Sequence, residues 1–366
     1  MTEFLYVYPM RVKTSFNLVA SKHFEYLSKI YKDLRPLDEN VFPNYLPMIK
    51  TRAIIHPLIY VMEKVMSRYN SMGVLKETYY RGWRDRYSDL IGFDVCDSDK
   101  MSSYAVELIN KVNKVAVPST HCVKVYQDSG VKAKVYWIPH GVDREWYENE
   151  NVWLERKGNF DPQLVNLYEY KKKTGKKILL FWLWHSSWRK GWDKVVKVYK
   201  RIRKERDDVV LVVKVVDPNI REFQDLQGVE FIKVWNWFDD FNKMALYDLA
   251  DIVLNFSRGG AWEINCSESL ARGVPCVSPD YGSWLDYEHP RFLIKRGKRE
   301  QPLPGNHIHV GHGYSVDVDD AVAKINEILD NLDEYKIIAE DHRQKLKEIF
   351  VWDKIVQMIV KMIEDS

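Results

Sequence analysis

Residues 251–279 read DIVLNFSRGGAWEINCSESLARGVPCVSP. An apolar run, DIVLNFS, is followed by a glycine pair, two glutamates, a short helical turn and a second apolar run, PCVSP. Short apolar runs bounded by turn residues predict strands that are buried on both faces, as in a parallel sheet. Gly259 and Gly260 have no side chain, so they let a ligand approach the backbone where the first strand ends. The stretch predicts an α/β fold with a ligand site at the carboxyl ends of its strands.

The segments around this stretch continue the alternation of strands and helices. Buried strands are expected at 178–184, 209–216 and 229–235, and WDKVVKVYKRIRKE, between the first two, has the spacing of an amphipathic helix. The first part of the chain supplies a second set, from FLYVYPM to KVYWIPHGVD. Two such sets predict two Rossmann-like, doubly wound domains that face a cleft.

Composition excludes some classes of protein. A net charge of +3 over 366 residues is too small for a general nucleic-acid-binding protein. The four cysteines lack metal-ligand spacing, which favours reduced thiols inside a cell. MTEFLYVYPMRVK shows no signal peptide, and the longest apolar runs are far shorter than a membrane span. We therefore expect a cytoplasmic protein, with the inner membrane surface as the alternative location.

The segment LFWLWHSSWRKGWDKVV (180–196) predicts a phosphate site. A buried strand ends there, and Arg189 and Lys190 stand just before a helix, whose amino terminus itself attracts anions. An arginine adds a planar fork of donors and a lysine adds a compact charge. The two cations are suited to bind a diphosphate and to stabilise it as it leaves. A solvated helix start with ordinary basic residues is the alternative.

Two carboxylates form the acidic half of the pattern. Glu268 is expected at the start of a short helix, where its carboxylate can accept hydrogen bonds from the vicinal hydroxyls of a ribose. The alternative is that Glu268 only offsets the positive end of that helix. For Glu263, the alternative to a catalytic role is an exposed loop acid.

Four stretches together resemble the family 4 glycosyltransferases, which are retaining enzymes of the glycosyltransferase B-type (GT-B) fold. They are VYWIPHGVDREWY (135–147), SSWRKGWDKVV (186–196), SESLARGVPCVSPDYG (267–282) and FVWDKIVQMIVKMIED (350–365). The likeness covers about residues 115–366. It implies an acceptor-side domain at 1–145, a nucleotide-sugar-binding domain at 146–347, and a helix at 348–366 that crosses back to the first domain.

The resemblance also implies an activity: transfer of a hexose, with retention and without a metal, from a nucleotide-diphosphate sugar to an acceptor, with no other cofactor. The implied catalytic residues are Arg189, Lys190 and Glu263. The implied donor-binding residues are His185, Gly259, Gly260 and Glu268. A non-catalytic protein of the same fold, which binds a nucleotide sugar or a glycan, is the alternative function.

The sequence departs from the family pattern at two of these positions. The family has two glutamates eight positions apart, but Gly260 stands where the first is expected, and Glu263 is the candidate substitute. His185 stands where the family usually has an arginine. Both changes bear on which donor is bound and on whether it is turned over.

The acceptor side has weaker signals. Asp97 follows a predicted strand, and His140 lies in the segment between the domains, where a structural role is the alternative. YYRGWRDRY (79–87) is an acceptor groove, a membrane-docking patch or a solvated loop. Asp317–Asp320 is read as a helix cap rather than a metal motif, and HIHVGH (307–312) lacks partners at zinc spacing.

Overall fold

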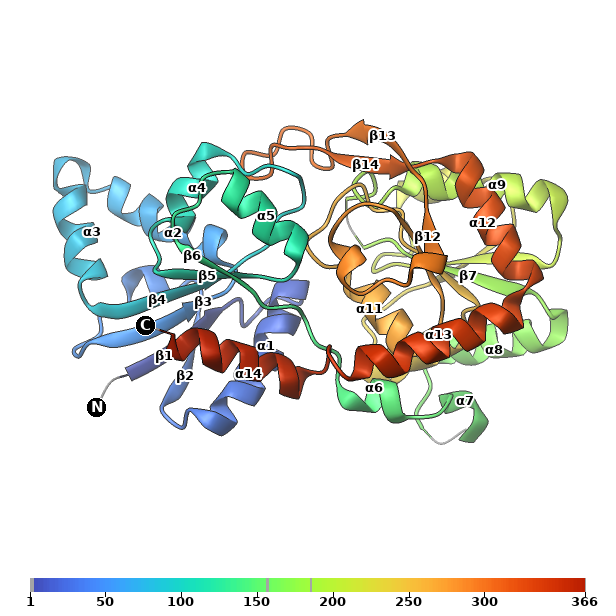
Figure 1. Cartoon of the computed structure of the whole chain (residues 1–366), viewed down its shortest axis with the longest axis horizontal. Coiled ribbons are helices and arrows are strands. Elements are labelled where there is room, and N and C mark those ends of the chain that lie inside the picture. The colour runs from blue at the N-terminus through green and yellow to red at the C-terminus, as the bar shows by residue number, and fades with distance from the viewer. Residues whose placement is uncertain (1–2, 156–157, 185, 366) are drawn as a thin grey trace. The chain divides into compact units, whose positions relative to one another are not determined.

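The computed structural model describes residues 3–155, 158–184 and 186–365, and the chain forms two compact units. Unit 1 comprises Met1–Gly141, Gly305–Val310 and Trp352–Ser366, and unit 2 comprises Val142–Pro304 and Gly311–Val351. Each unit is built on one six-stranded sheet with helices on both faces (Figure 1). The predicted α/β class with two doubly wound domains is confirmed.

The sheet of unit 1 is entirely parallel, in the order β2-β1-β3-β4-β5-β6. Its strands are β1 (Glu3–Tyr8), β2 (Leu34–Asp38), β3 (Thr51–Ile55), β4 (Tyr87–Phe93), β5 (Lys114–Val117) and β6 (Lys134–Trp137). The strand order reverses between β1 and β3. In doubly wound sheets, ligands bind beyond the carboxyl ends of the strands at such a reversal.

The helices of unit 1 are α1 (Ser15–Ile30), α2 (Leu58–Asn70), α3 (Lys76–Arg84), α4 (Ser103–Ile109), α5 (Thr120–Asp128) and α14 (Trp352–Glu364). α14 has buried residues at helical spacing, from Trp352 to Ile363, and it packs against α1 (Figure 1). Lys114 on β5 caps the last turn of α14, because its ammonium donates to the carbonyl of Met362 at 3.2 Å. The final helix is therefore an integral part of unit 1.

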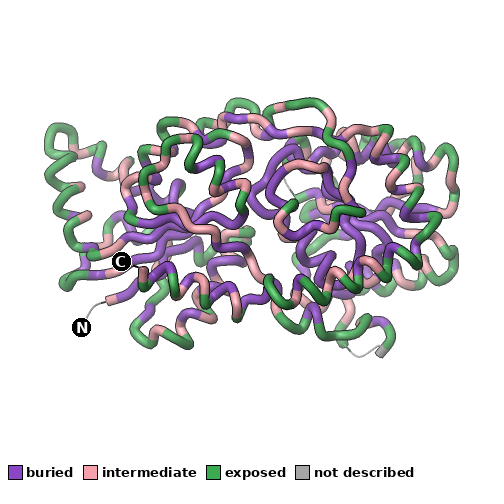
Figure 2. Tube along the Cα trace, viewed as in Figure 1, coloured by how far each residue is buried: buried purple, intermediate pink, exposed green. Residues whose placement is uncertain are grey.

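The sheet of unit 2 is also parallel, in the order β12-β11-β10-β7-β8-β9, with its reversal between β7 and β10. Its strands are β7 (Lys177–Trp182), β8 (Val209–Lys214), β9 (Phe231–Val234), β10 (Ile252–Leu254), β11 (Cys276–Pro279) and β12 (Leu293–Ile294). A separate hairpin pairs β13 (Arg296–Glu300) with β14 (Gly313–Val316). The apolar runs that predicted the central strands are buried (Figure 2).

The helices of unit 2 are α6 (Arg144–Glu148), α7 (Val152–Glu155), α8 (Pro162–Thr174), α9 (Trp192–Glu205), α10 (Asp240–Leu249), α11 (Ile264–Ala271), α12 (Val318–Asp330) and α13 (Leu332–Lys347). α9 and α12 lie on one side of the strands, and α8 and α13 lie on the other (Figure 1). Asp317 caps α12 by accepting from the amides of Asp319 and Asp320, which confirms the cap interpretation of this acidic run.

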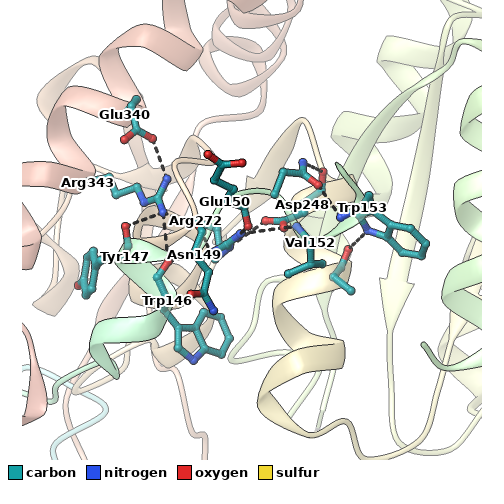
Figure 3. A network of polar contacts seen from close by, with 12 residues as sticks. Trp146, Tyr147, Asn149, Glu150, Val152, Trp153, Asp248, Arg272, Glu340 and Arg343 are labelled. Atoms are coloured by element: carbon teal, nitrogen blue, oxygen red, sulfur yellow. Dashed lines mark hydrogen bonds and ion pairs between the residues drawn. The ribbon is translucent and has the colours of Figure 1, made fainter. Parts of the chain in front are cut away.

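Arg272 holds the segment that begins unit 2 (Figure 3). Its guanidinium donates to both carboxylate oxygens of Asp248 at 2.8 Å and to the carbonyls of Trp146, Asn149 and Glu150 at 2.8–2.9 Å. All five donors of the guanidinium are thereby used. Arginine and aspartate are both buried, so the pair fixes α6 and the residues after it to the helical layer of unit 2.

Two expectations are corrected within the elements. Glu268 was expected at the start of a helix, but α11 begins at Ile264, so Glu268 lies in its second turn and Glu263 is the residue at the cap. The aromatic and basic run 79–87 is not a loop: it forms the end of α3 and the start of β4, with Trp83 and Tyr87 buried. Within the described ranges, no helix combines the length and the apolar character needed to cross a bilayer.

Candidate functional site

The predicted phosphate loop lies against the carboxyl end of β10. Gly191 precedes α9 with φ of +75°, and a Cβ there would lie 2.1 Å from the carbonyl oxygen of Phe256. The amide of Arg258 donates to the carbonyl of Arg189 at 2.7 Å. Glycine is required at position 191 because the two backbones touch there. The loop is thereby held beside the stretch that begins at the glycine pair.

Arg189 and Lys190 converge on one buried carboxylate. Nη1 of Arg189 lies 3.5 Å from Oε1 of Glu263 and donates to the carbonyl of Gly259 at 3.1 Å. The ammonium of Lys190 donates to Oε2 of Glu263. Glu263 is 2% exposed, so it is not the exposed loop acid considered as its alternative.

Gly260 is needed by this arrangement. A Cβ at position 260 would lie 2.5 Å from Oε1 of Glu263 and 3.5 Å from Nη1 of Arg189. The sequence suggested that this glycine admits a ligand; in the structure it is the carboxylate of Glu263 that lies against its backbone. The acid three residues later thus occupies the space beside the position where the family pattern has its first glutamate.

Glu268 is held from α10. Its Oε1 accepts from Nζ of Lys243 at 2.6 Å, and its Oε2 accepts from the hydroxyl of Tyr247 at 3.0 Å. Burial raises the pKa of Glu268, and Lys243 opposes that rise. Burial lowers the pKa of Lys243, but the carboxylates of Glu268 and Asp240 outweigh it, so the net shift is upward. Each oxygen of Glu268 keeps a second lone pair for a further donor, so ribose binding stays a prediction.

Arg258 is a positioning residue that sequence reasoning missed. Its fully buried guanidinium donates to the carbonyl of Trp188 at 2.6 Å and to the carboxylates of Glu300 and Asp193 at 2.7 and 3.1 Å. It also stacks 3.6 Å above the ring of Trp188. Arg258 therefore fixes the loop that carries the two site cations. The signal was its place directly before the glycine pair, at the end of a predicted strand.

Tryptophans gather on the loops that follow β7 and β9. The rings of Trp184 and Trp237 meet edge to face at 5.2 Å, and their exposed fractions are 36% and 42%. Lys214, at the end of β8, is buried near Trp182, and burial lowers its pKa to about 8. His185, the remaining donor-binding prediction, lies outside the described residues.

The carboxyl edge of unit 1 contains a cluster of buried histidines. The hydroxyl of Tyr6 lies 2.8 Å from Nδ1 of His23 and 3.4 Å from Nδ1 of His56. The half-buried His140 lies near them, with its ring centroid 6.4 Å from that of Trp352. Burial lowers the pKa of His56 and of His140 to about 3, and it lowers the pKa of His23 strongly as well. These imidazoles are therefore neutral at pH 7, where they can both donate and accept.

Asp94 is the acid that the structure places at the end of β4. Its carboxylate accepts from the amides of Ile59 and Val95 at 2.5 and 2.7 Å, and burial raises its pKa to about 7. Asp97, the predicted acceptor-side acid, lies three residues further, and its amide donates to Nδ1 of His309 at 3.4 Å. His56 and Asp94 both follow an apolar strand directly in the sequence, which is the signal that could have found them.

Two other clusters of polar side chains lie elsewhere in unit 2. A cavity of about 330 Å³ at the amino edge of the sheet is lined by charges that pair with one another, such as Arg272 with Asp248. Among the described residues, one group of three has metal-ligand types at short range: Cys266, Cys276 and Glu288, within 4.8 Å of one another. The hydroxyl of Ser278 lies between them, 2.9 Å from the carboxylate, so hydrogen bonds hold this group together.

Comparison with known sequences gives two relatives from viruses, and no family model matches. The chain is 31% identical over 367 residues to uncharacterized protein 356 of Sulfolobus islandicus rod-shaped virus 1, which covers 98% of this chain and 97% of the relative. It is 25% identical over 285 residues to a protein named "Putative glycosyltransferase 45" of Sulfolobus islandicus filamentous virus (isolate Iceland/Hveragerdi), covering 73% of each.

Comparison with solved structures gives glycosyltransferases over the whole chain. Sucrose-phosphate synthase from Thermosynechococcus elongatus has a TM-score of 0.67 at 12% identity, over 99% of this chain and 98% of that one. An E. coli structure bound with UDP-2-fluoro glucose has a TM-score of 0.65 at 8% identity, over 100% of this chain and 99% of that one. An α,α-trehalose-phosphate synthase from Burkholderia xenovorans in complex with glucose-6-phosphate has a TM-score of 0.61 at 9% identity, over 95% of this chain and 78% of that one. The chain therefore belongs to the family of viral protein 356, and it has the GT-B fold of glycosyltransferases.

Proposed function

We propose that this protein is a retaining glycosyltransferase that moves a hexosyl group from a nucleoside-diphosphate sugar without a metal ion. One observation carries the proposal: Arg189 and Lys190 converge on the carboxylate of Glu263 at the carboxyl edge of unit 2. That edge, at the reversal of strand order, is where doubly wound domains bind nucleotides. The sequence relative named as a glycosyltransferase and the structure that binds a UDP sugar support the same reading.

The proposed chemistry follows from the charges. A departing nucleoside diphosphate gains negative charge in the transition state, and fixed cations aimed at it are the main catalytic resource. Arg189 and Lys190 would supply that charge. In the proposed reaction the acceptor hydroxyl attacks the anomeric carbon on the face of the leaving group. The bond from that carbon to the phosphate oxygen breaks, and the hydroxyl proton passes to the departing phosphate.

Glu263 would orient the two cations and contact the sugar. Its carboxylate holds Lys190 and Arg189 in one place, and Gly260 leaves room for it. In this proposal Glu268 shares its carboxylate with the hydroxyls of the ribose while Lys243 keeps it ionised. His56, His140 and Asp94 would serve the acceptor, because neutral imidazoles and a carboxyl group with a pKa near 7 suit hydroxyl recognition.

A panel of nucleoside-diphosphate sugars tests the proposal. The release of free diphosphate, with each donor in turn and with EDTA present, measures both turnover and metal independence. Donor binding is followed separately by tryptophan fluorescence, because Trp184 and Trp237 lie exposed at this edge. NMR of the first product gives the configuration at the anomeric carbon. Release that requires an added divalent cation, or an inverted product, would contradict the corresponding part of the proposal.

A non-catalytic sugar-nucleotide-binding protein is the second candidate. The observation that favours it is that both acids already have a protein cation: Glu263 has Lys190, and Glu268 has Lys243. A donor would then bind without being cleaved. Fluorescence quenching by a donor that releases no diphosphate, with or without added acceptors, would support this candidate over the enzyme.

Docking of unit 1 at a membrane surface is the proposed route to a lipid-linked acceptor. The turn Gly73–Leu75 and α3 expose apolar side chains next to basic ones: Val74 is 98% exposed, Tyr79 is 51% exposed, and Arg81 follows on α3. Such a patch suits an anionic interface. Cosedimentation with vesicles that contain phosphatidylglycerol, and its loss in Val74→Glu, tests this. Equal binding of both proteins would exclude it.

A further inference from the structure

Cys96 and Cys122 in unit 1 lie closer together than two separate thiols do. Both side chains are fully buried, and their sulfur atoms are 2.8 Å apart. Non-bonded carbon atoms settle at about 3.5–4.0 Å, and sulfur is the larger atom. A covalent disulfide needs a separation of about 2.05 Å. The observed distance lies between the two, in a site where no solvent separates the sulfurs.

The backbone holds the two cysteines in this position from two neighbouring elements. Cys96 lies on the loop after β4, and Cys122 is in the first turn of α5, where its amide donates to the hydroxyl of Ser119 at 3.2 Å. Tyr126, one turn further along α5, donates from its hydroxyl to the carbonyl of Val95 at 3.3 Å. β4 and β5 are adjacent in the sheet, so the two sulfurs face each other across a fixed junction.

We propose that Cys96 and Cys122 are a disulfide-forming pair. In the reaction each thiol gives up one proton and one electron, and an external disulfide such as oxidised glutathione accepts both pairs and leaves as two thiols. Burial raises the pKa of Cys96, which disfavours its thiolate in the folded unit. Both side chains are fully buried, so an external disulfide would reach them while the chain folds, before α5 closes over the loop.

The second pair of cysteines in the chain is a built-in control. Cys266 and Cys276 are also buried, but both sulfurs lie beside the hydroxyl of Ser278, at 3.5 and 3.8 Å. Glu288 lies in the same group, 3.9 Å from the sulfur of Cys266. Cys122 also donates to a carbonyl, that of Cys96 at 3.7 Å, so the distinguishing feature of the first pair is its sulfur contact of 2.8 Å. We therefore expect Cys266 and Cys276 to stay reduced under conditions that join the first pair.

The bond would fix a loop that bears on the candidate acceptor side. Asp94 and Asp97 flank Cys96, and the disulfide would tie their loop to α5. The inference does not depend on the proposed enzyme activity. Its tests need no substrate, so the disulfide proposal and the proposed enzyme activity can fail independently of each other.

Thiol counting after refolding tests the pair. The full chain is refolded from guanidinium chloride with a mixture of reduced and oxidised glutathione, and is then denatured and titrated for free thiols without a reductant. We expect two free thiols, and four after reduction, because the chain has four cysteines. Peptide mapping without reduction is expected to join the peptides that contain Cys96 and Cys122.

Alanine variants identify the cysteines that are joined. Cys96→Ala is expected to show three free thiols both before and after reduction, since Cys122 has lost its partner. Cys266→Ala, the matched control, is expected to show one free thiol before reduction and three free thiols after it. Four free thiols in the refolded wild type, or a bond between Cys266 and Cys276, would overturn the proposal.

Thermal unfolding gives a second readout on folded protein. Reduction of the wild type is expected to lower its Tm by roughly 5–10 °C, because the cross-link restricts the unfolded chain. The double variant Cys96→Ala/Cys122→Ala is expected to show the same Tm with and without the reductant. An equal response of both proteins to the reductant would count against the bond.

Discussion

Two groups of buried ion pairs in unit 2, one at each edge of its sheet, engage their cations differently. At the amino edge, Arg272 donates all five of its N–H groups to Asp248 and to backbone carbonyls, so the protein saturates this guanidinium (Figure 3). At the carboxyl edge, Arg189 and Lys190 both contact one carboxylate, that of Glu263. A saturated arginine stabilises the fold, and two cations that converge at the ends of the strands are suited to an anionic ligand.

The largest expected effect is on stability, at the amino edge. Arg272→Ala leaves Asp248 buried without its cation, with the amide of Val152 as a remaining donor, which costs about 3–5 kcal/mol of the free energy of unfolding. Calorimetry is expected to show a large fall in the Tm of unit 2. Arg343→Ala is the matched control, because Arg343 binds carbonyls of the same segment but pairs with the half-exposed Glu340, so its loss costs much less. Equal losses of stability in both variants would show that the buried pair of Arg272 and Asp248 contributes no more than the half-exposed pair of Arg343 and Glu340.

The next effect is on turnover, at the carboxyl edge. Lys190→Ala removes one of the two cations, and the rate is expected to fall about 100- to 1000-fold, as when one transition-state donor is lost. The donor found in the panel provides the assay. Lys194→Ala, a lysine of the following helix that lies beside Asp193, is the control and should keep full activity. If melting temperature and activity fell in equal proportion in Lys190→Ala, its role would be structural.

Gly260→Ala tests whether turnover depends on the position of the Glu263 carboxylate at the carboxyl edge. Its methyl group would lie 2.5 Å from Oε1 of Glu263, so the acid must move, at a cost of about 1–3 kcal/mol for the overpacked site. We expect a roughly tenfold fall in turnover, measured with the same donor. Gly82→Ala is the control, since nothing lies within 4 Å of its Cβ position. The double variant Gly260→Glu/Glu263→Gly moves the acid to the family position, and recovery of activity there would show that the carboxylate itself is what the site needs.

The last effect, spread over several pH units, is a pH dependence from Glu288, an acid that forms no ion pair among the described residues. Burial raises the pKa of Glu288 to about 8, above its value near 4.5 in the unfolded chain. The folded state therefore binds more protons between these values, and stability falls as the pH rises through that window, by up to about 1.4 kcal/mol per pH unit. Glu288→Gln is expected to flatten this slope in chemical denaturation measured from pH 5 to 8. An unchanged slope would mean that Glu288 is ionised in the folded protein.

The sequence predicted the fold well because buried strands and helix caps are local signals. The apolar runs of unit 2 became its central strands, and Asp317 became a cap as its acidic run indicated. The start of α11 was wrong because Glu263 makes no side-chain capping bond, so the usual marker of a helix start is missing. Local pattern alone placed Glu268 four residues too near the helix terminus.

The candidate site was only partly predictable, because its contacts join distant residues. Arg189 and Lys190 were expected on one loop and Glu263 on another, and their convergence depends on two backbones meeting at Gly191. Arg258 was missed since an arginine in a strand-ending loop usually faces solvent, whereas this one is fully buried. In unit 1, His56 and Asp94 have no motif around them: each follows an apolar strand, but the burial that shifts its pKa is seen only in the structure.

The placement of α14 has a consequence for synthesis. Residues of unit 2 end at Val351, while Trp352 begins the helix that packs on α1 of unit 1. A nascent chain therefore carries all of unit 2 before it carries α14. Of the two units, unit 1 is begun first and completed last. Until α14 has been synthesised, the face of α1 that packs against it is not covered by that helix.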